Sequence, residues 1–189
     1  NESKLAALAG NLRKDYEVDV RIIPVDLTLE NAVADLLDAL QEADIGIRVL
    51  VNNAGFGSFG PFLQHGDEVY QRMISLNISA LTGLTRGLLP GMIASAEKGA
   101  KTGIMNVASV AAFQPGPLTA VYFATKSYVL SFSEALHEEL KGSGVVVSTF
   151  CPGPTRTGFF SRKDMAPSGE ISDQDDVGNR RRQARRMDA

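Results

Sequence analysis

The sequence has few of the residues that build disulfides and metal sites. Its single cysteine, Cys151, excludes an internal disulfide, and this scarcity predicts a protein of the reducing cytoplasm. The two histidines, His65 and His137, have no cysteine, second histidine or paired acid at ligand spacing. We therefore expect no metal site.

Long apolar runs and an excess of one charge are also missing. No apolar run approaches the length that spans a membrane, and no secretory signal opens the chain. The net charge of −3 gives no electrostatic reason to bind nucleic acid or anionic lipid, so we expect neither kind of partner and no membrane. The 189 residues, 44% of them hydrophobic, suit one soluble globular domain.

The hydrophobic pattern alternates between helical and strand-like segments. Apolar residues at helical spacing predict helices at 2–15, after a capping Thr28, at one or two places within 67–92, and at 119–141. Strand-like runs, several of them rich in β-branched residues, predict strands at 18–25, 47–51, 103–108 and 145–150. Strands that alternate with helices indicate parallel β-α-β units. We therefore predict an α/β fold, a doubly wound, Rossmann-like parallel sheet with helices on both faces.

Polar side chains or sharp turns come directly after the predicted strands. Asp26, Asn52 and Ser109 each follow a strand, and Cys151-Pro152-Gly153 follows the last one. The carboxyl ends of the strands in an open α/β sheet form the edge where ligands bind. The sequence therefore predicts a binding site at that edge.

Tyr122 and Lys126 form a candidate acid-base pair in the helix predicted at 119–141. Four residues make about one helical turn, so the phenol and the ammonium project from one face. A nearby cation favours the charged form of a tyrosine, whose ordinary pKa is about 10. Such a tyrosine can transfer protons near neutral pH.

The segment from Gly55 to Gly60 matches the pattern G-x-G-x-x-G but lacks the context of a dinucleotide-binding loop. That loop requires a helix opening at the third glycine and a second strand that ends in an acid about 20 residues later. Here Pro61 follows Gly60, and the next strand predicted is at 103–108. No other glycine cluster is better placed, so the sequence shows no loop that would cradle a phosphate.

Several segments occur in a characteristic order: Asn52-Asn53-Ala54-Gly55, Asn77, Ser109, Tyr122, Lys126 and Pro152-Gly153-Pro154-Thr155. In that order and spacing they resemble the short-chain dehydrogenase/reductase family, and within it a broad bacterial group of uncertain substrate range. The resemblance covers residues 1–165, which we expect to form a partial catalytic domain, followed by a charged tail at 166–189. The family's first two strands and glycine-rich loop would precede residue 2, so we expect a fragment that is incomplete at the N-terminus and also at the C-terminus.

The resemblance implies an NAD(P)-dependent oxidoreductase that interconverts an alcohol and a carbonyl. Tyr122 would be the general acid and base, and Ser109 would hold the substrate oxygen. Lys126 would lower the tyrosine pKa and bind the nicotinamide ribose, and Asn77 would bind a water that continues the proton path. Alternatively, Asn77 could be only a structural amide.

The cofactor, NADP or NAD, would be held by segments at the ends of the strands. Asp26 and Leu27 would contact the adenine, although Asp26 could merely cap a helix. The remaining contacts implied by the resemblance are Asn53, Ala54, Gly55, Tyr122, Lys126, Pro152, Gly153 and Thr155. The choice between NAD and NADP cannot be read, because the residues that decide it lie in the missing segments.

The resemblance also implies a homodimer or homotetramer and a small carbonyl or alcohol substrate. Phe113, Phe159 and Phe160 hint that this substrate is apolar, but they could equally be core residues. Two rival hypotheses stay open: a non-catalytic module that cannot hold a cofactor, and an epimerase or dehydratase acting on nucleotide sugars. Because two strands would be missing between 18–25 and 47–51, we also expect exposed sheet edges and a tendency to aggregate.

Overall fold

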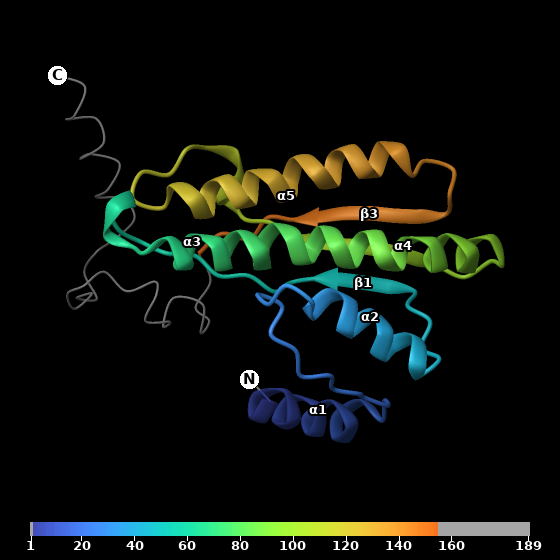
Figure 1. Ribbon diagram of the computed structural model, residues 1–189. Coiled ribbons are helices and arrows are strands. Elements are labelled where there is room, and N and C mark those ends of the chain that lie inside the picture. The colour runs from blue at the N-terminus through green and yellow to red at the C-terminus, as the bar shows by residue number, and fades with distance from the viewer. Residues whose placement is uncertain (1, 155–189) are drawn as a thin grey trace.

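The computed structural model describes residues 2–154 of the chain (Figure 1). Its longer helices are α1 (Glu2–Tyr16), α2 (Ala32–Glu42), α3 (Asp67–Ile74), α4 (Leu81–Glu97) and α5 (Ala120–Glu139). Its strands are β1 (Val49–Asn52), β2 (Thr102–Val107) and β3 (Val145–Phe150). Shorter turns of helix are η1 (Phe62–Gln64), the π-helical η2 (Ser75–Ala80) and η3 (Val110–Phe113).

The three strands form one parallel sheet in the order β1-β2-β3. Their aligned residues place Leu50, Ile104 and Val147 side by side on one face, where β-branched and leucine side chains pack well. Met92 from α4 and Leu136 from α5 pack against this face. The main hydrophobic core therefore lies between the sheet and these two helices.

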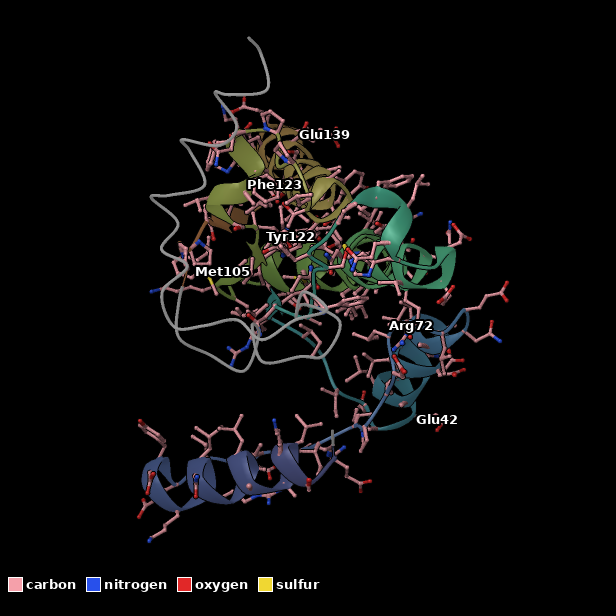
Figure 2. The ribbon with its side chains drawn as sticks, turned by 90° about the vertical axis from the view of Figure 1, so that its left-hand side faces the viewer. Glu42, Arg72, Met105, Tyr122, Phe123 and Glu139 are labelled. Atoms are coloured by element: carbon pink, nitrogen blue, oxygen red, sulfur yellow. The ribbon has the colours of Figure 1, made fainter. Side chains whose placement is uncertain are left out.

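The opposite face of the sheet is exposed in the described residues. Val49, Val51, Met105, Val146 and Phe150 lie on it or at its end, with exposed fractions between 36% and 63%. Figure 2 looks onto the end of the sheet where the strands finish, with Met105 labelled there. The expectation of helices on both faces is thus met on one face only within residues 2–154.

The segment at 18–25 does not form the predicted strand. A strand exists only through hydrogen bonds to a neighbour, and the described residues place no strand beside this segment. Its contacts are instead local: the Arg13 guanidinium of α1 donates a hydrogen bond to the Val20 carbonyl. The two views agree that α1 stands apart from the sheet (Figures 1 and 2).

One predicted helix boundary also needs correction. Thr28 does not cap a helix, because its amide and hydroxyl both donate to the Asp26 carboxylate, at 3.0 and 2.8 Å, and α2 begins only at Ala32. The predicted helical stretch within 67–92 is one continuous rod made of α3, η2 and α4. None of the helices in the described residues is long and apolar enough to cross a membrane.

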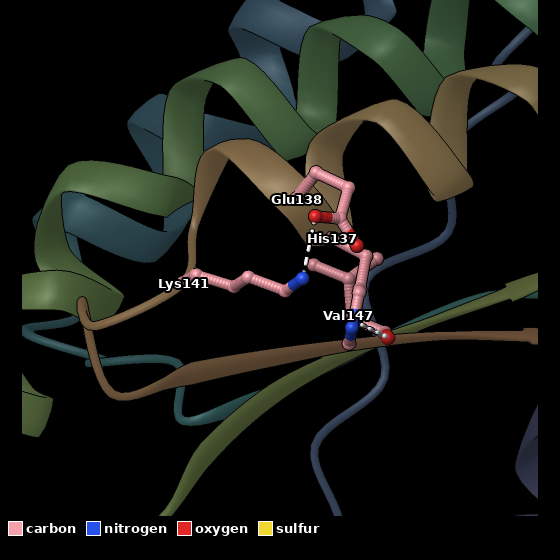
Figure 3. A network of polar contacts seen from close by, with 4 residues as sticks. All are labelled: His137, Glu138, Lys141 and Val147. Atoms are coloured by element: carbon pink, nitrogen blue, oxygen red, sulfur yellow. Dashed lines mark hydrogen bonds and ion pairs between the residues drawn. The ribbon is translucent and has the colours of Figure 1, made fainter.

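The C-terminal half of α5 is fastened to β3 by a polar contact at the side of the core. His137 donates from Nδ1 to the Val147 carbonyl over 3.0 Å (Figure 3). One turn further on, Lys141 and Glu138 form an exposed ion pair, a type that adds little stability. The hydrogen bond from His137 thus connects α5 to β3. The other end of α5 carries Tyr122 and Lys126.

Candidate active site

The ends of the three strands bring the predicted catalytic segments together. Ser109 follows β2, the Pro152-Gly153 turn follows β3, and the first turns of α5 carry Tyr122 and Lys126. Backbone hydrogen bonds tie the segments beyond the strands: Ala108 donates to the Phe150 carbonyl at 2.8 Å, and Val110 donates to the Pro152 carbonyl at 3.1 Å. Figure 2 shows Tyr122 at this end of the molecule.

Ser109 is held by the start of η3. Its Oγ accepts a hydrogen bond from the Ala111 amide at 3.1 Å, so the side chain caps this short helix and stays buried. The same hydroxyl hydrogen-bonds the Tyr122 phenol. A capped serine beside the phenol has a fixed orientation, which suits a group that must hold a substrate oxygen.

Tyr122 packs its ring against the buried cluster of Phe56, Tyr70 and Met73. Burial disfavours the phenolate and raises the pKa of Tyr122, and the hydrogen bond from Ser109 lowers it by less. The sequence predicts that Lys126 lowers the pKa of Tyr122. Among the described residues, burial raises this pKa instead. The phenol is kept protonated, as an acid that donates to a carbonyl must be.

Lys126 is almost completely buried, with 5% of its surface exposed. Its Nζ donates to the Val107 carbonyl over 2.8 Å and lies 5.9 Å from the centre of the Tyr122 ring. Desolvation lowers the pKa of Lys126 to about 8, although the nearby Cys151 opposes the change. The ammonium has three N–H donors, and one of them is bonded within the described residues.

Asn77 lies in the π-helical turn η2 and joins three parts of the site. Its Nδ2 donates to the Phe56 carbonyl at 2.9 Å and to the Thr125 hydroxyl at 3.0 Å, while its Oδ1 accepts from the Phe56 amide at 3.1 Å. The turn lets one residue leave the helical repeat and face inward, as π-turns at functional sites often do. Both amide hydrogens are committed to the protein.

Gly55 occupies a place where a larger residue would press on these side chains. A Cβ added at Gly55 would lie 3.1 Å from the Asn77 Oδ1 and 3.5 Å from the Lys126 Nζ. At Gly55 the backbone of the loop after β1 therefore lies directly against the side chains of Asn77 and Lys126. The immediate neighbours of Gly55 are thus side chains of this chain, and its predicted contact with a cofactor stays a prediction.

A buried hydrogen bond between two asparagine side chains joins β1 to β2. The Asn52 Nδ2 donates to the Asn106 Oδ1 at 2.9 Å and also to the Thr85 hydroxyl at 3.1 Å. Asn106 in turn donates to the Ser133 hydroxyl of α5 at 2.8 Å. Asn52 therefore ties β1 to β2 through its side chain. Asn106 was missed, although a polar residue on the covered face of a strand could have signalled it.

Thr125 is a second residue that sequence reasoning missed. It is buried, accepts from Asn77 and donates to the Tyr122 carbonyl at 2.8 Å. It sits in α5 between Tyr122 and Lys126, and it links the π-turn to the helix that carries them. The four-residue spacing indicates Tyr122 and Lys126 at the two ends of this segment, and it gives no signal for the residue between them.

The other residues expected to hold a cofactor come from three separate segments of the chain. Asn53 and Ala54 are exposed in the loop after β1, and Pro152 and Gly153 lie in the turn after β3. Asp26 and Leu27 lie in the turn before α2, where hydrogen bonds from Thr28 lower the pKa of Asp26, with a smaller contribution from the charge of Arg72. The alternative that Asp26 merely caps a turn matches these bonds. Thr155, Phe159 and Phe160 lie outside the described residues, as does the predicted tail.

A proton-transfer centre is what these side chains can form chemically. A half-buried phenol, a serine hydroxyl bonded to it and a desolvated ammonium lie together where three strands end. Among residues 2–154 no group of three or more His, Cys, Asp or Glu could hold a metal. General acid-base transfer to an oxygen is the chemistry this set supports.

The chain matches the family model of the short chain dehydrogenases over residues 1–167 and belongs to that family. It is 35% identical over 156 residues to the human very-long-chain 3-oxoacyl-CoA reductase, which covers 80% of the chain and 48% of the human protein. It is 36% identical to sulfoacetaldehyde reductase 2 of Chromohalobacter salexigens, over 84% of the chain and 61% of that protein. The chain thus spans about half the length of the human relative.

A solved structure of similar fold is a short-chain dehydrogenase from Sphingobium yanoikuyae in complex with NADPH. It is 35% identical and superposes with a TM-score of 0.78, covering 91% of the chain and 65% of that protein. The L-sorbose reductase of Gluconobacter frateurii, complexed with NADPH and L-sorbose, is 30% identical with a TM-score of 0.72, over 81% of the chain and 57% of that protein. The predicted Rossmann-like fold and family are thereby confirmed, and the described sheet is part of that fold.

Proposed function

We propose that the protein interconverts an alcohol and a carbonyl with a nicotinamide dinucleotide, NADP or NAD, and that Tyr122 transfers the proton. The observation that carries the proposal is the meeting of Ser109, Tyr122 and Lys126 at the carboxyl ends of the strands. The relatives support it, because several solved neighbours are complexes with NADPH or NADH and the curated relatives are reductases.

The residues present fit such a cofactor in part. The buried Lys126 ammonium keeps N–H donors for a ribose diol. The loop that would cradle the pyrophosphate is not found in this sequence. When bound, the cofactor supplies or accepts the hydride.

The chain's own side chains then handle the oxygen and its proton. Ser109 donates a hydrogen bond to the carbonyl oxygen, and the Tyr122 phenol, which is protonated at neutral pH and whose pKa burial raises further, gives its proton to that oxygen. Lys126 in its charged form stabilises the phenolate that remains. Asn77 keeps the loop at Phe56 and the helix at Thr125 in place and acts as a positioning residue.

The experiment compares Tyr122→Phe with Tyr128→Phe in the full-length protein. Tyr128 lies on the same helix, and its hydroxyl bonds only Thr82 among the described contacts. We expect Tyr122→Phe to lower kcat at least about a thousandfold, because it removes the proton that the carbonyl oxygen receives, while cofactor binding is retained. Tyr128→Phe should keep near-normal turnover. Normal turnover in Tyr122→Phe would refute the mechanism.

A second candidate function is that of a module that does not bind a cofactor. Its basis is that the sequence shows no phosphate-binding loop, whereas the family and the NADPH complex of a solved neighbour favour the oxidoreductase. Titration of the 189-residue chain with NADPH and NADH, followed by fluorescence, separates the two: saturable micromolar binding would exclude the module. No observation favours the nucleotide-sugar epimerase or dehydratase.

The assembly and location of the protein belong to the same proposal. The resemblance to the family supports a homodimer or homotetramer that packs through the long rod of α3, η2 and α4 and through α5. Light scattering of the full-length protein would test the assembly. A cytoplasmic location and the boundary between a catalytic part at 1–165 and a charged tail at 166–189 also stay predictions.

A further inference from the structure

Thr125 lies inside the molecule, on the same side of α5 as the two residues of the acid-base pair. It stands three residues after Tyr122 and directly before Lys126, so the three side chains share one face of the helix. Only 1% of its surface is exposed. A buried hydroxyl costs stability unless it is hydrogen-bonded, so the partners of Thr125 define what the residue does.

The hydroxyl of Thr125 has one hydrogen, and the contacts show where it points. The Thr125 Oγ1 donates to the Tyr122 carbonyl over 2.8 Å, a bond that threonines within helices often make. The Asn77 Nδ2 donates to the same Oγ1 over 3.0 Å. Because the single hydrogen is used within the helix, the oxygen meets Asn77 only as an acceptor.

Asn77 connects this hydroxyl to the loop after β1. Its Nδ2 also donates to the Phe56 carbonyl at 2.9 Å, and its Oδ1 accepts from the Phe56 amide at 3.1 Å. The two bonds fix which end of the side-chain amide faces Thr125, since the reverse orientation would set donor against donor at the Phe56 amide. One side-chain amide therefore joins η2, the loop after β1 and α5.

The side chain of Phe56 lies in the buried cluster against which the Tyr122 ring packs. The contacts therefore form a closed path that leads from the Tyr122 backbone through Thr125, Asn77 and Phe56 to the Tyr122 ring. A closed path of this kind holds the ring and its helix at one position relative to the loop. The Tyr122 phenol is thereby held beside the Ser109 hydroxyl to which it is bonded.

The hydroxyl of Thr125, and not the volume of its side chain, makes this connection. Valine has nearly the shape of threonine but lacks the hydroxyl, so it would fill the same space and lose the bond to Asn77. Proton transfer is sensitive to such a loss, because a displacement of about 1 Å can lower the rate of a reaction about a hundredfold.

We infer that Thr125 is a positioning residue for the proton transfer, which holds the Tyr122 phenol in place through Asn77 and Phe56 without touching the substrate. The inference rests on the proposed function and adds a residue to its machinery. Lys126 has its own bond to the Val107 carbonyl, so the inference concerns the place of the phenol and not the binding of the cofactor.

The experiment compares Thr125→Val with Thr125→Ser in the full-length protein, assayed with NADPH and NADH on hexanal, cyclohexanone and glyceraldehyde. Thr125→Val should lower kcat about tenfold to a hundredfold while KM changes by less than about threefold, because the geometry of proton transfer suffers and binding does not. Thr125→Ser keeps the hydroxyl and should restore kcat to within about threefold of wild type.

The matched control is Thr85→Val. Thr85 in α4 is 2% exposed, and its hydroxyl accepts from the Asn52 Nδ2 over 3.1 Å, so the substitution removes an equivalent buried bond. Both valine variants should melt a few degrees below wild type, by similar amounts, yet Thr85→Val should keep kcat within about threefold. An equal fall of kcat in the two variants, or no rescue by Thr125→Ser, would overturn the inference.

A spectroscopic readout does not depend on turnover. In protein made with isotope-labelled tyrosine, the NMR resonance of the Tyr122 ring, identified with Tyr122→Phe, should move in Thr125→Val and stay in place in Thr85→Val. An unmoved resonance in Thr125→Val would overturn the inference alone. Absence of wild-type turnover with every carbonyl compound and both cofactors would refute the proposed function and, with it, the role of Thr125 in proton transfer.

Discussion

At the scale of single residues, Lys126 titrates within reach of ordinary assay conditions. Its pKa is lowered from 10.5 to about 8 by burial, so the folded chain releases this proton at a lower pH than the unfolded chain does. Below pH 8 both states hold the proton, and the buried charge costs stability in full. As the pH rises from 8 toward 10.5 the folded state sheds the charge and that cost disappears.

We therefore expect the free energy of unfolding to gain a rising contribution from Lys126 between about pH 8 and 10, on the order of 3 kcal/mol if the whole shift is realised. Urea unfolding across this range, compared with Lys126→Met, measures the difference in slope. The hydrogen bond to Val107 that the variant loses shifts both ends of the curve equally. Lys98→Met, at an exposed lysine, should follow the wild-type slope, and equal slopes in wild type and Lys126→Met would contradict the expectation.

The identity of the candidate catalytic residues could be predicted from the sequence, but their protonation could not. Tyr122 and Lys126 were found because helical spacing places them on one face. Their pKa values depend on burial by residues far away in sequence, such as Phe56 and Met73 in the cluster beside Tyr122. A sequence pattern contains no measure of that burial.

At the scale of elements, the rod of α3, η2 and α4 depends on Asn77 at its irregular turn. Asn77→Ala would remove the two hydrogen bonds that Asn77 makes with the Phe56 backbone and the one that it makes with Thr125. We expect a loss of about 2–4 kcal/mol in the free energy of unfolding, because three buried hydrogen bonds are lost and each contributes roughly 1 kcal/mol. Chemical denaturation measures it.

Asn31→Ala provides the matched control, since Asn31 is exposed before α2 and its side chain makes no capping bond. It should change stability by less than about 0.5 kcal/mol. Similar small effects in both variants would mean that Asn77 adds no stability to the rod.

Regular elements were predictable where a repeating pattern defines them, and the exceptions have a common cause. The strands β1, β2 and β3 lie within a residue or two of the predicted ranges, and β3 matches 145–150. The π-turn was missed because it depends on Asn77 meeting Phe56, 21 residues earlier. The strand at 18–25 was wrong because its composition suits a strand but no described strand pairs with it.

At the scale of the whole molecule, the uncovered face of the sheet dominates the behaviour of the chain on its own. Val49 and Val146 are each 63% exposed on the outer strands β1 and β3. Contiguous apolar surface and open strand edges favour association. We expect the 189-residue chain to bind a hydrophobic dye and to aggregate on warming.

The test replaces both valines with lysine. Val49→Lys with Val146→Lys should reduce dye binding several-fold and slow aggregation without lowering stability by more than about 1 kcal/mol, because both side chains already face water. Val147→Lys, one residue along β3 and only 5% exposed, should instead unfold the core. A chain that melts sharply as a dye-free monomer would contradict the expectation.

The amide bridge between Asn52 and Asn106 also selects among alternative alignments of the strands. A slip of β1 that put Val51 in the place of Asn52 would turn Asn52 to the uncovered face, and the valine side chain cannot satisfy Asn106 and Thr85. Each polar group stranded in this way costs about 1–3 kcal/mol. Apolar side chains such as Leu50 and Val51 would tolerate the shift far better. The hydrogen bond between the two asparagines thus favours the native register of β1 and β2, which the hydrophobic residues of the sheet specify poorly.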